Sequence, residues 1–382
     1  MIYFDNAATT FPKPQAVVEE VRRCMLTYGG NPGRGAHSLS LAAAKRVFEC
    51  RSEAAELFGA SDADRVFFTP NTTVGINTVL KGILKKGDHV IISDMEHNAV
   101  YRPIYKLAQD GVIEYDIFKT LTCDSRQNPL RICANIAKLI RPNTRMIFCT
   151  HASNICSEVL PIASIGAFCR KHGLLFCVDG AQSAGHENID VGAMNIDALC
   201  LPGHKGLYGP QGSGLVVLGD GIALDTLIEG GNGIDSLLPE MSPSAPERYE
   251  AGTVATPCIA GLCEGIRTLR RTGIESIADR ERQMTRRLYE LLGNTKGITL
   301  YAPEYAGSIT LFNVDGVPSE KVTTALDAHG VCVRGGYHCS ALAHKILATP
   351  EGGAVRASVG MFNKPAEVEL FYKIVKTVMN EV

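Results

Sequence analysis

Several features that would assign this protein to a class by themselves are missing from its sequence. No apolar run approaches the ~18 residues that a membrane-spanning helix needs, and there is neither a repeat with a period of roughly 20–50 residues nor a low-complexity segment. The N-terminal stretch has no basic region followed by an apolar core, so no secretory signal is expected. No long basic run is present, and 38 basic residues nearly balance 40 acidic ones. We therefore expect neither nucleic acid nor a membrane as the principal partner.

The number and spacing of the cysteines also argue against two kinds of site. Their number, thirteen, is odd, and no two are spaced as C-x-x-C. This disfavours both a disulfide framework and a tetrahedral zinc site, and we expect no metal. Most of the cysteines are interpreted as small buried apolar residues of a cytoplasmic protein, because the cytoplasm keeps thiols reduced.

The composition predicts an ordinary globular protein with two domains. The chain has 382 residues, of which 45% are hydrophobic and 20% are charged, and this length is large for one domain. Strand-like runs alternate with helical patterns over 65–218, which predicts a parallel sheet covered on both faces. From 298 onward the strands are shorter and more typical of antiparallel pairing. We assign 15–255 to a large domain, and 1–14 with 256–382 to a smaller one.

Helices are expected at 17–28, 40–58, 78–84, 162–172 and 259–292, followed by two further helices toward the C-terminus. The charged cluster 279–282 within the long helical stretch is interpreted as a solvated face. The segment 209–214 superficially resembles a dinucleotide-binding loop, but it lacks the G-x-G-x-x-G spacing, so that interpretation is discarded.

One lysine stands where a reactive amine is expected. Lys205 lies in the Gly- and Pro-rich turn 201–210, between the apolar runs 198–201 and 215–218. An amine held by stiff backbone at the end of a strand suits a lysine whose pKa must fall so that it can form a Schiff base with a carbonyl. By itself, the same pattern also fits a lysine in a surface loop.

Upstream, the apolar run 176–178 ends in Asp179, followed by two small residues. This pattern indicates a buried strand that delivers a carboxylate to the carboxyl edge of a sheet. Such a carboxylate can pair with the protonated pyridinium nitrogen of pyridoxal 5'-phosphate (PLP). A helix N-cap is the alternative role for this aspartate.

The runs Asp179-Gly180-Ala181-Gln182 and Gly203-His204-Lys205 together resemble the PLP-dependent enzymes of the class V aminotransferase group. Within that group the sequence is most similar to the group II cysteine desulfurases, which have a short cysteine loop and include selenocysteine-lyase-like members. The resemblance extends from Tyr3-Phe4-Asp5-Asn6-Ala7-Ala8-Thr9-Thr10 to Arg356-Ala357-Ser358. It implies an α/β protein of PLP fold-type I, with a mostly parallel seven-stranded type of sheet in the large domain and a smaller α+β C-terminal domain.

A phosphate site is predicted after the strand at 65–69. A small polar turn at 70–77 and a helix follow that strand, and a helix N-terminus favours an anion because its backbone N–H groups are free. Thr72 and Thr73 are therefore interpreted as phosphate ligands. A threonine N-cap without any ligand is the alternative.

Further cofactor contacts follow from the resemblance. His97, just after the strand at 87–93, would stack on the cofactor ring and move protons, although a structural histidine is the general alternative. Asn154 would face the ring oxygen and the substrate, and Gln182 and His204 would also bind the cofactor.

The resemblance also implies a homodimer. In the family, the threonine of the run that corresponds to Glu250-Ala251-Gly252-Thr253 reaches the phosphate of the partner subunit, so Thr253 would complete the partner's site. The Gly-rich loop 29–37, which includes Arg34 and His37, would lie near the mouth of the site or serve as a connector.

A thiol is the second candidate reactive group. Cys339 follows two glycines and His338 in a polar loop, a setting that favours a thiolate, although it could be an ordinary loop cysteine. Cys332 lies in an apolar alternation and is interpreted as core. The resembled enzymes often have two histidines before their catalytic cysteine. Here Tyr337 takes the first position, which puts a proton-transfer role there in doubt but leaves the nucleophile in place.

Two arginines are candidates for binding a substrate carboxylate. A planar guanidinium binds a carboxylate in a bidentate manner, and with better orientation than lysine. Arg356 is predicted as this group, with Arg334 as an auxiliary, whereas each alone could be a surface arginine.

The predicted function is therefore that of a cysteine desulfurase. Such an enzyme removes sulfur from L-cysteine, releases L-alanine and leaves a persulfide on Cys339 for an acceptor protein, with Lys205 and His97 as proton carriers. The alternative is a selenocysteine lyase acting on L-selenocysteine, or a class V aminotransferase or lyase acting on another amino acid. A non-catalytic binding protein of the same fold is disfavoured by the presence of both Lys205 and Cys339.

Overall fold

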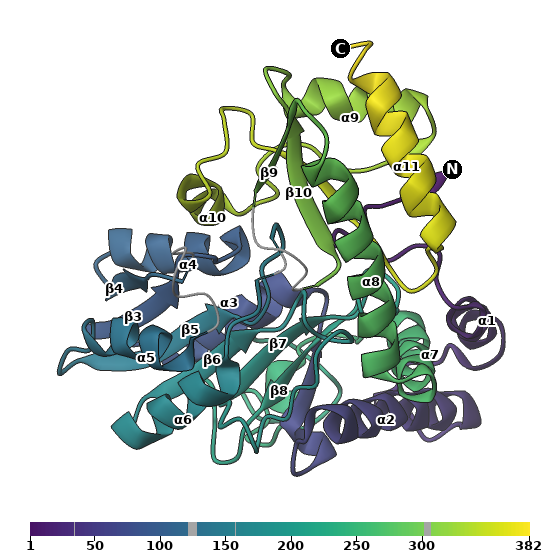
Figure 1. The fold of residues 1–382 in the computed structure, drawn as a ribbon. Helices are drawn as coiled ribbons and strands as arrows, with labels where there is room; N and C mark the ends of the chain where they lie inside the picture. The colour runs from purple at the N-terminus through teal and green to yellow at the C-terminus, as the bar shows by residue number, and fades with distance from the viewer. Residues whose placement is uncertain (34, 121–127, 157, 302–306) are drawn as a thin grey trace.

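A seven-stranded sheet forms the centre of the computed structural model, which describes residues 1–33, 35–120, 128–156, 158–301 and 307–382 (Figure 1). Its strands are β2 (Val66–Thr69), β3 (Asp88–Ser93), β4 (Ile113–Phe118), β5 (Thr144–Thr150), β6 (Leu175–Asp179), β7 (Ala198–Pro202) and β8 (Gly214–Leu218). They lie in the order β2-β8-β7-β6-β5-β3-β4. The neighbouring pairs from β7 to β4 are parallel, and β8 runs antiparallel to both of its neighbours. The mostly parallel sheet is thereby confirmed.

Helices cover both faces of this sheet, which explains why its central strands are apolar throughout. The helices in this part of the chain are α1 (Gln15–Arg23), α2 (Ser38–Phe58), α3 (Thr72–Ile83), α4 (Asn98–Gln109), α5 (Pro129–Ala137), α6 (Ile162–His172), α7 (Thr256–Thr272) and α8 (Ile274–Gly293). Apolar side chains of α2, α6 and α7 pack into one core cluster, and those of α3 and α4 pack into another. Among the described helices, none is both long enough and apolar enough to cross a membrane.

Several helix predictions differ from the structure in their bounds, and the helix expected at 17–28 is α1 followed by a π-helical turn over Cys24–Tyr28. The helix expected at 78–84 begins already at Thr72, because the Asn71 side chain accepts a hydrogen bond from the Val74 N–H (3.0 Å) and caps the helix there. The stretch expected as one helix over 259–292 is two helices, α7 and α8. Gly273 separates them with φ of 86°, a conformation that glycine adopts without steric cost.

The interpretation of 279–282 as a solvated face is wrong for one residue. Asp279 and Arg282 form an ion pair near the surface (2.7 Å), but Glu281 is only 1% exposed. Its carboxylate lies 2.7 Å from Nδ1 of His186, which belongs to the segment after β6. Successive helical residues point in different directions, so one member of a charged run can face the interior when a partner is waiting there.

The C-terminal part of the chain forms a second, smaller layer. Strands β9 (Ile298–Tyr301), β10 (Ile309–Val314) and β12 (Val355–Ser358) form an antiparallel sheet. Its helices are α9 (Ser319–Ala328), α10 (Ala341–Ile346) and α11 (Pro365–Val378), one more than the two expected. The N-terminal strand β1 (Ile2–Tyr3) pairs in parallel with β11 (Val331–Cys332). The N-terminus lies beside α11 (Figure 1). The ring of Phe4 there contacts that of Phe371 in α11.

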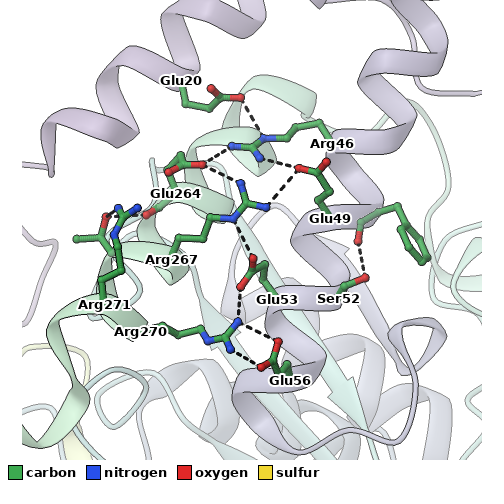
Figure 2. A network of polar contacts seen from close by, with 12 residues as sticks. Glu20, Arg46, Glu49, Ser52, Glu53, Glu56, Glu264, Arg267, Arg270 and Arg271 are labelled. Carbon is green, nitrogen blue, oxygen red and sulfur yellow. Dashed lines mark hydrogen bonds and ion pairs between the residues drawn. The ribbon is translucent and has the colours of Figure 1, made fainter.

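The predicted domain boundary after residue 255 stays a prediction, and the packing of α7 bears on it. Arginines of α7 form ion pairs with glutamates of α2, including Arg267 with Glu53 (2.8 Å), and Arg46 of α2 contacts Glu264 of α7 (2.6 Å) (Figure 2). Both pairs are at least half-buried, and apolar side chains of α2 and α7 pack in one core cluster with the strands of the large sheet. Both the ion pairs with α2 and the apolar contacts therefore place α7 with the large sheet.

Candidate active site

A cavity of about 340 Å³ lies at the carboxyl ends of β5, β6 and β7. In open α/β sheets this edge is where ligands bind, because the loops that follow parallel strands converge there. The cavity is lined by nearly all the residues predicted from the sequence: Thr72, Thr73, His97, Asn154, Asp179, Gln182, His204, Lys205, Arg334, Cys339 and Arg356. Segments far apart along the chain thus meet at one place.

Lys205 and Asp179 occupy the floor of this cavity. Asp179 is the last residue of β6 and is 2% exposed, and one of its carboxylate oxygens accepts a hydrogen bond from the Ala181 N–H (2.9 Å). Burial raises the pKa of Asp179, whereas the charge of Lys205 acts against this shift. Burial also lowers the pKa of Lys205 to about 8, although Asp179 opposes it. An amine with this pKa is partly neutral, and hence nucleophilic, near physiological pH.

One end of the cavity has the donors that an anion requires. It is formed by the N-terminus of α3, where Asn71 caps only the Val74 N–H. The hydroxyl of Thr72 and Nδ1 of His204 are buried and have no hydrogen-bond partner in the described chain. Burial, with Lys205 and Lys13 nearby, lowers the pKa of His204 to about 4. Unpaired buried polar atoms beside a helix N-terminus are what a phosphate group would satisfy.

The opposite end holds the two predicted arginines, joined by an aspartate that the sequence interpretation missed. Asp5 accepts hydrogen bonds from Nη2 of Arg334 (2.9 Å) and from Nη2 of Arg356 (3.0 Å). Nη1 of Arg356 donates to the backbone oxygen of Asn154 (2.9 Å). Arg356 is 3% exposed, yet its Nε has no hydrogen-bond partner in the described chain. One edge of this guanidinium therefore remains available to a carboxylate.

His97 is fixed by the start of α4. Its Nδ1 accepts a hydrogen bond from the Ala99 N–H (3.0 Å), as the N-cap of that helix. Burial, followed by the charges of Lys205 and Arg356, lowers the pKa of His97 to about 4. At neutral pH the ring is therefore neutral, and because Nδ1 is an acceptor, its proton is on Nε2.

Cys339 is exposed at the rim of the cavity, and its backbone is bonded to the start of α4. Its carbonyl oxygen accepts a hydrogen bond from the Asn98 N–H (2.7 Å). Cys332 lies in β11 and is half-buried, so its interpretation as a core residue holds only in part. Tyr337 is 48% exposed and does not line the cavity, and its hydroxyl accepts a hydrogen bond from the Gly352 N–H (3.0 Å).

The N-terminal arm contributes more than the sequence interpretation assigned to it. Besides Asp5, the residues Ala7, Ala8 and Thr9 belong to this arm and line the cavity. The hydroxyl of Thr9 donates to the backbone oxygen of His204 (3.1 Å), next to Lys205. The signal that could have identified these residues is the mostly polar run 5–10, which lies in the stretch 3–10 where the family resemblance begins.

Thr253 lies elsewhere on the molecule. It is exposed, its hydroxyl accepts a hydrogen bond from the Asn31 side chain (3.4 Å), and it borders a larger open cavity of about 510 Å³ between α2 and the segment 231–254. Thr253 is therefore not a ligand of the site in its own chain. Arg34 lies outside the described residues. Within the described ranges, no group of three or more His, Cys, Asp or Glu side chains is arranged to hold a metal ion.

The fold and this cavity agree with the family comparison. The model of the Aminotransferase class-V family matches residues 2–371, which is nearly the whole chain. The protein belongs to this family, and its α/β fold is that of PLP fold-type I.

Individual relatives narrow the resemblance further. A probable cysteine desulfurase of Methanothermobacter thermautotrophicus is 34% identical over 97% of this chain and 92% of its own. A cysteine desulfurase of Yersinia pseudotuberculosis is 32% identical over 97% and 91%. Among solved structures, the apo form of a cysteine desulfurase from Thermococcus onnurineus has a TM-score of 0.89 at 30% identity, covering 100% of this chain and 95% of that one. A cysteine desulfurase from Escherichia coli has a TM-score of 0.87 at 26% identity, with the same coverage.

Proposed function

We propose that this protein is a PLP-dependent cysteine desulfurase, which converts L-cysteine to L-alanine and leaves the sulfur as a persulfide on Cys339. The observation that carries the proposal is that a lysine of lowered pKa, a buried carboxylate, an available guanidinium edge and an exposed thiol all line one cavity. The relatives named as cysteine desulfurases support it over the full length of the chain.

The residues of the cavity fit PLP. Lys205 would hold the cofactor covalently, and Asp179 would face its ring nitrogen, because a buried carboxylate is stabilised by an adjacent cation. The unpaired Thr72 hydroxyl and His204 Nδ1 would bind the phosphate together with Thr73 at the N-terminus of α3. His97, Asn154 and Gln182 complete the ring contacts. When bound, PLP withdraws electrons from the α-carbon of an amino acid.

The remaining residues bind the substrate and move its atoms. Arg356 would hold the α-carboxylate through its Nε edge, with Arg334 beside it. Lys205, once released from the cofactor, would take and return the proton at the α-carbon, assisted by His97. The Cys339 thiolate would attack the substrate sulfur, so that an S–S bond forms and the C–S bond breaks. The electron pair of the broken bond stays with the carbon, which is then protonated to give alanine.

A homodimer is part of the proposal. Thr253 and the neighbouring cavity are exposed, and α1, α2 and the turn between them present the exposed apolar residues Met25, Leu26, Leu41 and Phe48. A second copy that covers this surface would receive Thr253 as a phosphate ligand. Mixed dimers of a Lys205→Ala and a Thr253→Ala subunit test this. If Thr253 acts across the interface, one of the two sites keeps every residue, whereas action within the chain damages both sites.

We place the protein in the cytoplasm and expect a protein acceptor for the sulfur. Buried core cysteines such as Cys149, Cys177 and Cys200 are free thiols, and free thiols are suited to a reducing compartment. The identity of the acceptor is set by the pathway that the protein serves.

Purified protein with PLP, incubated with L-cysteine, should release alanine and sulfide in equal amounts in the presence of a thiol reductant. A parallel incubation with L-selenocysteine separates the desulfurase from a selenocysteine lyase, which would turn over that substrate far faster. Formation of pyruvate or of a new amino acid from a keto acid, without sulfide, would instead identify another class V activity and overturn the proposal.

A further inference from the structure

The backbone at the reactive cysteine is held in an unusual conformation. His338 has φ of 50° and Cys339 has φ of 58°, which places both in the left-handed region that residues other than glycine rarely adopt. Such a conformation persists only where the surroundings determine it. The contacts of this segment therefore hold its backbone in place.

On one side, the carbonyl oxygens of the segment accept hydrogen bonds from the start of α4 and from the loop after β5. The Asn98 N–H donates to the Cys339 oxygen (2.7 Å), and the Asn154 side chain donates to the His338 oxygen (2.8 Å). These bonds fix where the peptide groups lie. A separate set of hydrogen bonds holds the side of the segment that faces the smaller layer.

On that other side, the ring of His338 is bonded at both nitrogens. Nε2 lies 3.1 Å from the backbone oxygen of Arg334, and a carbonyl only accepts, so Nε2 carries a proton. Burial, followed by the charge of Arg356, lowers the pKa of His338 to about 3, so the ring is neutral and Nδ1 is an acceptor. The donor to Nδ1, 3.1 Å away, is Nε2 of His344.

His344 is in turn fixed by its own contacts. It belongs to α10 and is 2% exposed, and its ring stacks on that of His338 with the ring centroids 5.4 Å apart and an angle of 17°. With Nε2 donating to His338, Nδ1 of His344 must accept, and the hydroxyl of Thr349 lies 2.9 Å from it. The chain of donors thus runs in one direction, from Thr349 to His344 to His338 to the Arg334 oxygen.

We propose that His344 is a positioning residue for the Cys339 thiol, acting through the hydrogen bond from its Nε2 to His338. This inference rests on the proposed function, because it concerns the nucleophile of that reaction. It has a chemical consequence: with both ring nitrogens of His338 engaged, the histidine next to Cys339 in sequence is not its base. The positive charges that interact with the Cys339 side chain are instead the guanidinium groups of Arg334 and Arg356, which line the same cavity.

Three substitutions test the hydrogen bond itself. His344→Gln keeps an N–H donor near the position of Nε2, whereas His344→Leu removes it and keeps comparable bulk. Thr349→Val is a milder change that removes only the hydroxyl that donates to Nδ1 of His344. It replaces His344→Leu in the test if the leucine variant does not fold. His329→Leu is the matched control, because His329 lies at the surface of the smaller layer in an ion pair with Glu381.

The readouts are kcat and KM for L-cysteine, hydrogen exchange of the segment 335–341, and the pH profile of Cys339 alkylation by iodoacetamide, all on the protein with PLP bound.

His344→Leu should lower kcat roughly ten- to hundredfold, the size of effect that a misplaced reacting group produces, with KM and PLP content unchanged. Exchange of the segment should be faster in this variant. His344→Gln should restore both values to within about threefold. The pH midpoint of alkylation should be the same in all variants, since neither histidine is the base.

Three results would overturn the inference: equal kcat in His344→Leu and the unmodified protein, equal loss in the glutamine and leucine variants, or a shifted alkylation midpoint. The exchange and alkylation measurements do not require turnover. If the unmodified protein released no sulfide from cysteine, the proposed function would fail, while these two measurements would still decide the role of His344.

Discussion

Asn154 donates a hydrogen bond of 2.8 Å to the backbone oxygen of His338, which is 184 positions away in the chain. Asn154 follows β5 of the large sheet, and His338 immediately precedes the exposed Cys339. This bond therefore attaches the segment that contains Cys339 to the rim of the cavity. We therefore expect the Cys339 thiol to reach only a short distance from the cavity, because the segment cannot move outward without losing hydrogen bonds to both layers.

The short reach predicts which step limits turnover. With L-cysteine alone, removal of sulfur from Cys339 should be slow, because the acceptor must come to the cavity. Alanine formation in a single turnover should then be about tenfold or more faster than steady-state turnover, and a small reductant should close the gap. Rapid-quench measurement of alanine checks this. Equal single-turnover and steady-state rates would show that the limit lies in an earlier step.

Lys205→Ala should abolish covalent binding of PLP, so the purified variant should lack the yellow colour of the unmodified protein. The unmodified apo-protein adds a pH test. Only the neutral amine reacts with a carbonyl, so the rate of PLP capture should rise with pH and level off above the Lys205 pKa of about 8. Stopped-flow absorbance at several pH values measures it. A rate that keeps rising toward pH 10 would indicate an ordinary, hydrated lysine.

Cys339→Ser should stop sulfide release from cysteine while PLP binding stays intact, because a hydroxyl does not attack sulfur effectively. Cys332→Ser is the matched control. Cys332 is half-buried in β11, so its substitution should cost some stability and leave turnover within about twofold, as is usual away from reacting groups. Sulfide assays and thermal melts compare the two variants. If Cys332→Ser stopped sulfide release and Cys339→Ser did not, the nucleophile would be Cys332.

Asp5→Asn should weaken substrate binding more than it slows the chemical steps. Asp5 orients Arg356 and balances one of two adjacent positive charges, and hydrogen bonds to charged groups contribute about 1.5–3 kcal/mol. We expect KM for cysteine to rise about tenfold or more, with a smaller change in kcat. Asp279→Asn, at an exposed ion pair, is the control. An unchanged KM in the Asp5 variant would contradict the proposal that Asp5 holds Arg356 in place for a substrate carboxylate.

Glu281→Gln should destabilise the protein in a pH-dependent manner. Burial alone would lower the pKa of His186, but the Glu281 carboxylate reverses this and raises it above its ordinary value. A histidine whose pKa is raised by folding contributes stability that is fully present below pH ~6.5 and is lost as the pH rises through the folded-state pKa. Breaking a buried pair costs about 3–5 kcal/mol. Urea unfolding at pH 6 and pH 9 should show the larger loss at pH 6, and an equal loss at both would contradict the ion pair.

The local patterns of this sequence predicted most of its elements and several of the residues that line the cavity. Apolar runs bounded by Gly and Pro marked the strands of the large sheet, and the residues at their carboxyl ends, such as Asp179 and Lys205, could be selected because parallel strands bring those ends together. The family resemblance extended this set to Arg356 and Cys339, which no local pattern separates from an ordinary arginine or loop cysteine.

Tertiary structure decided the rest, because it depends on which distant segments pack together. No local signal showed that Asp5 lies between two arginines more than three hundred positions away, that Glu281 turns inward from a charged run to meet His186, or that His344 bonds the histidine beside Cys339. Each of these is a polar group whose burial is favourable only with a particular partner. The sequence determines that such groups exist, and the packing of the two layers determines which partner each one meets.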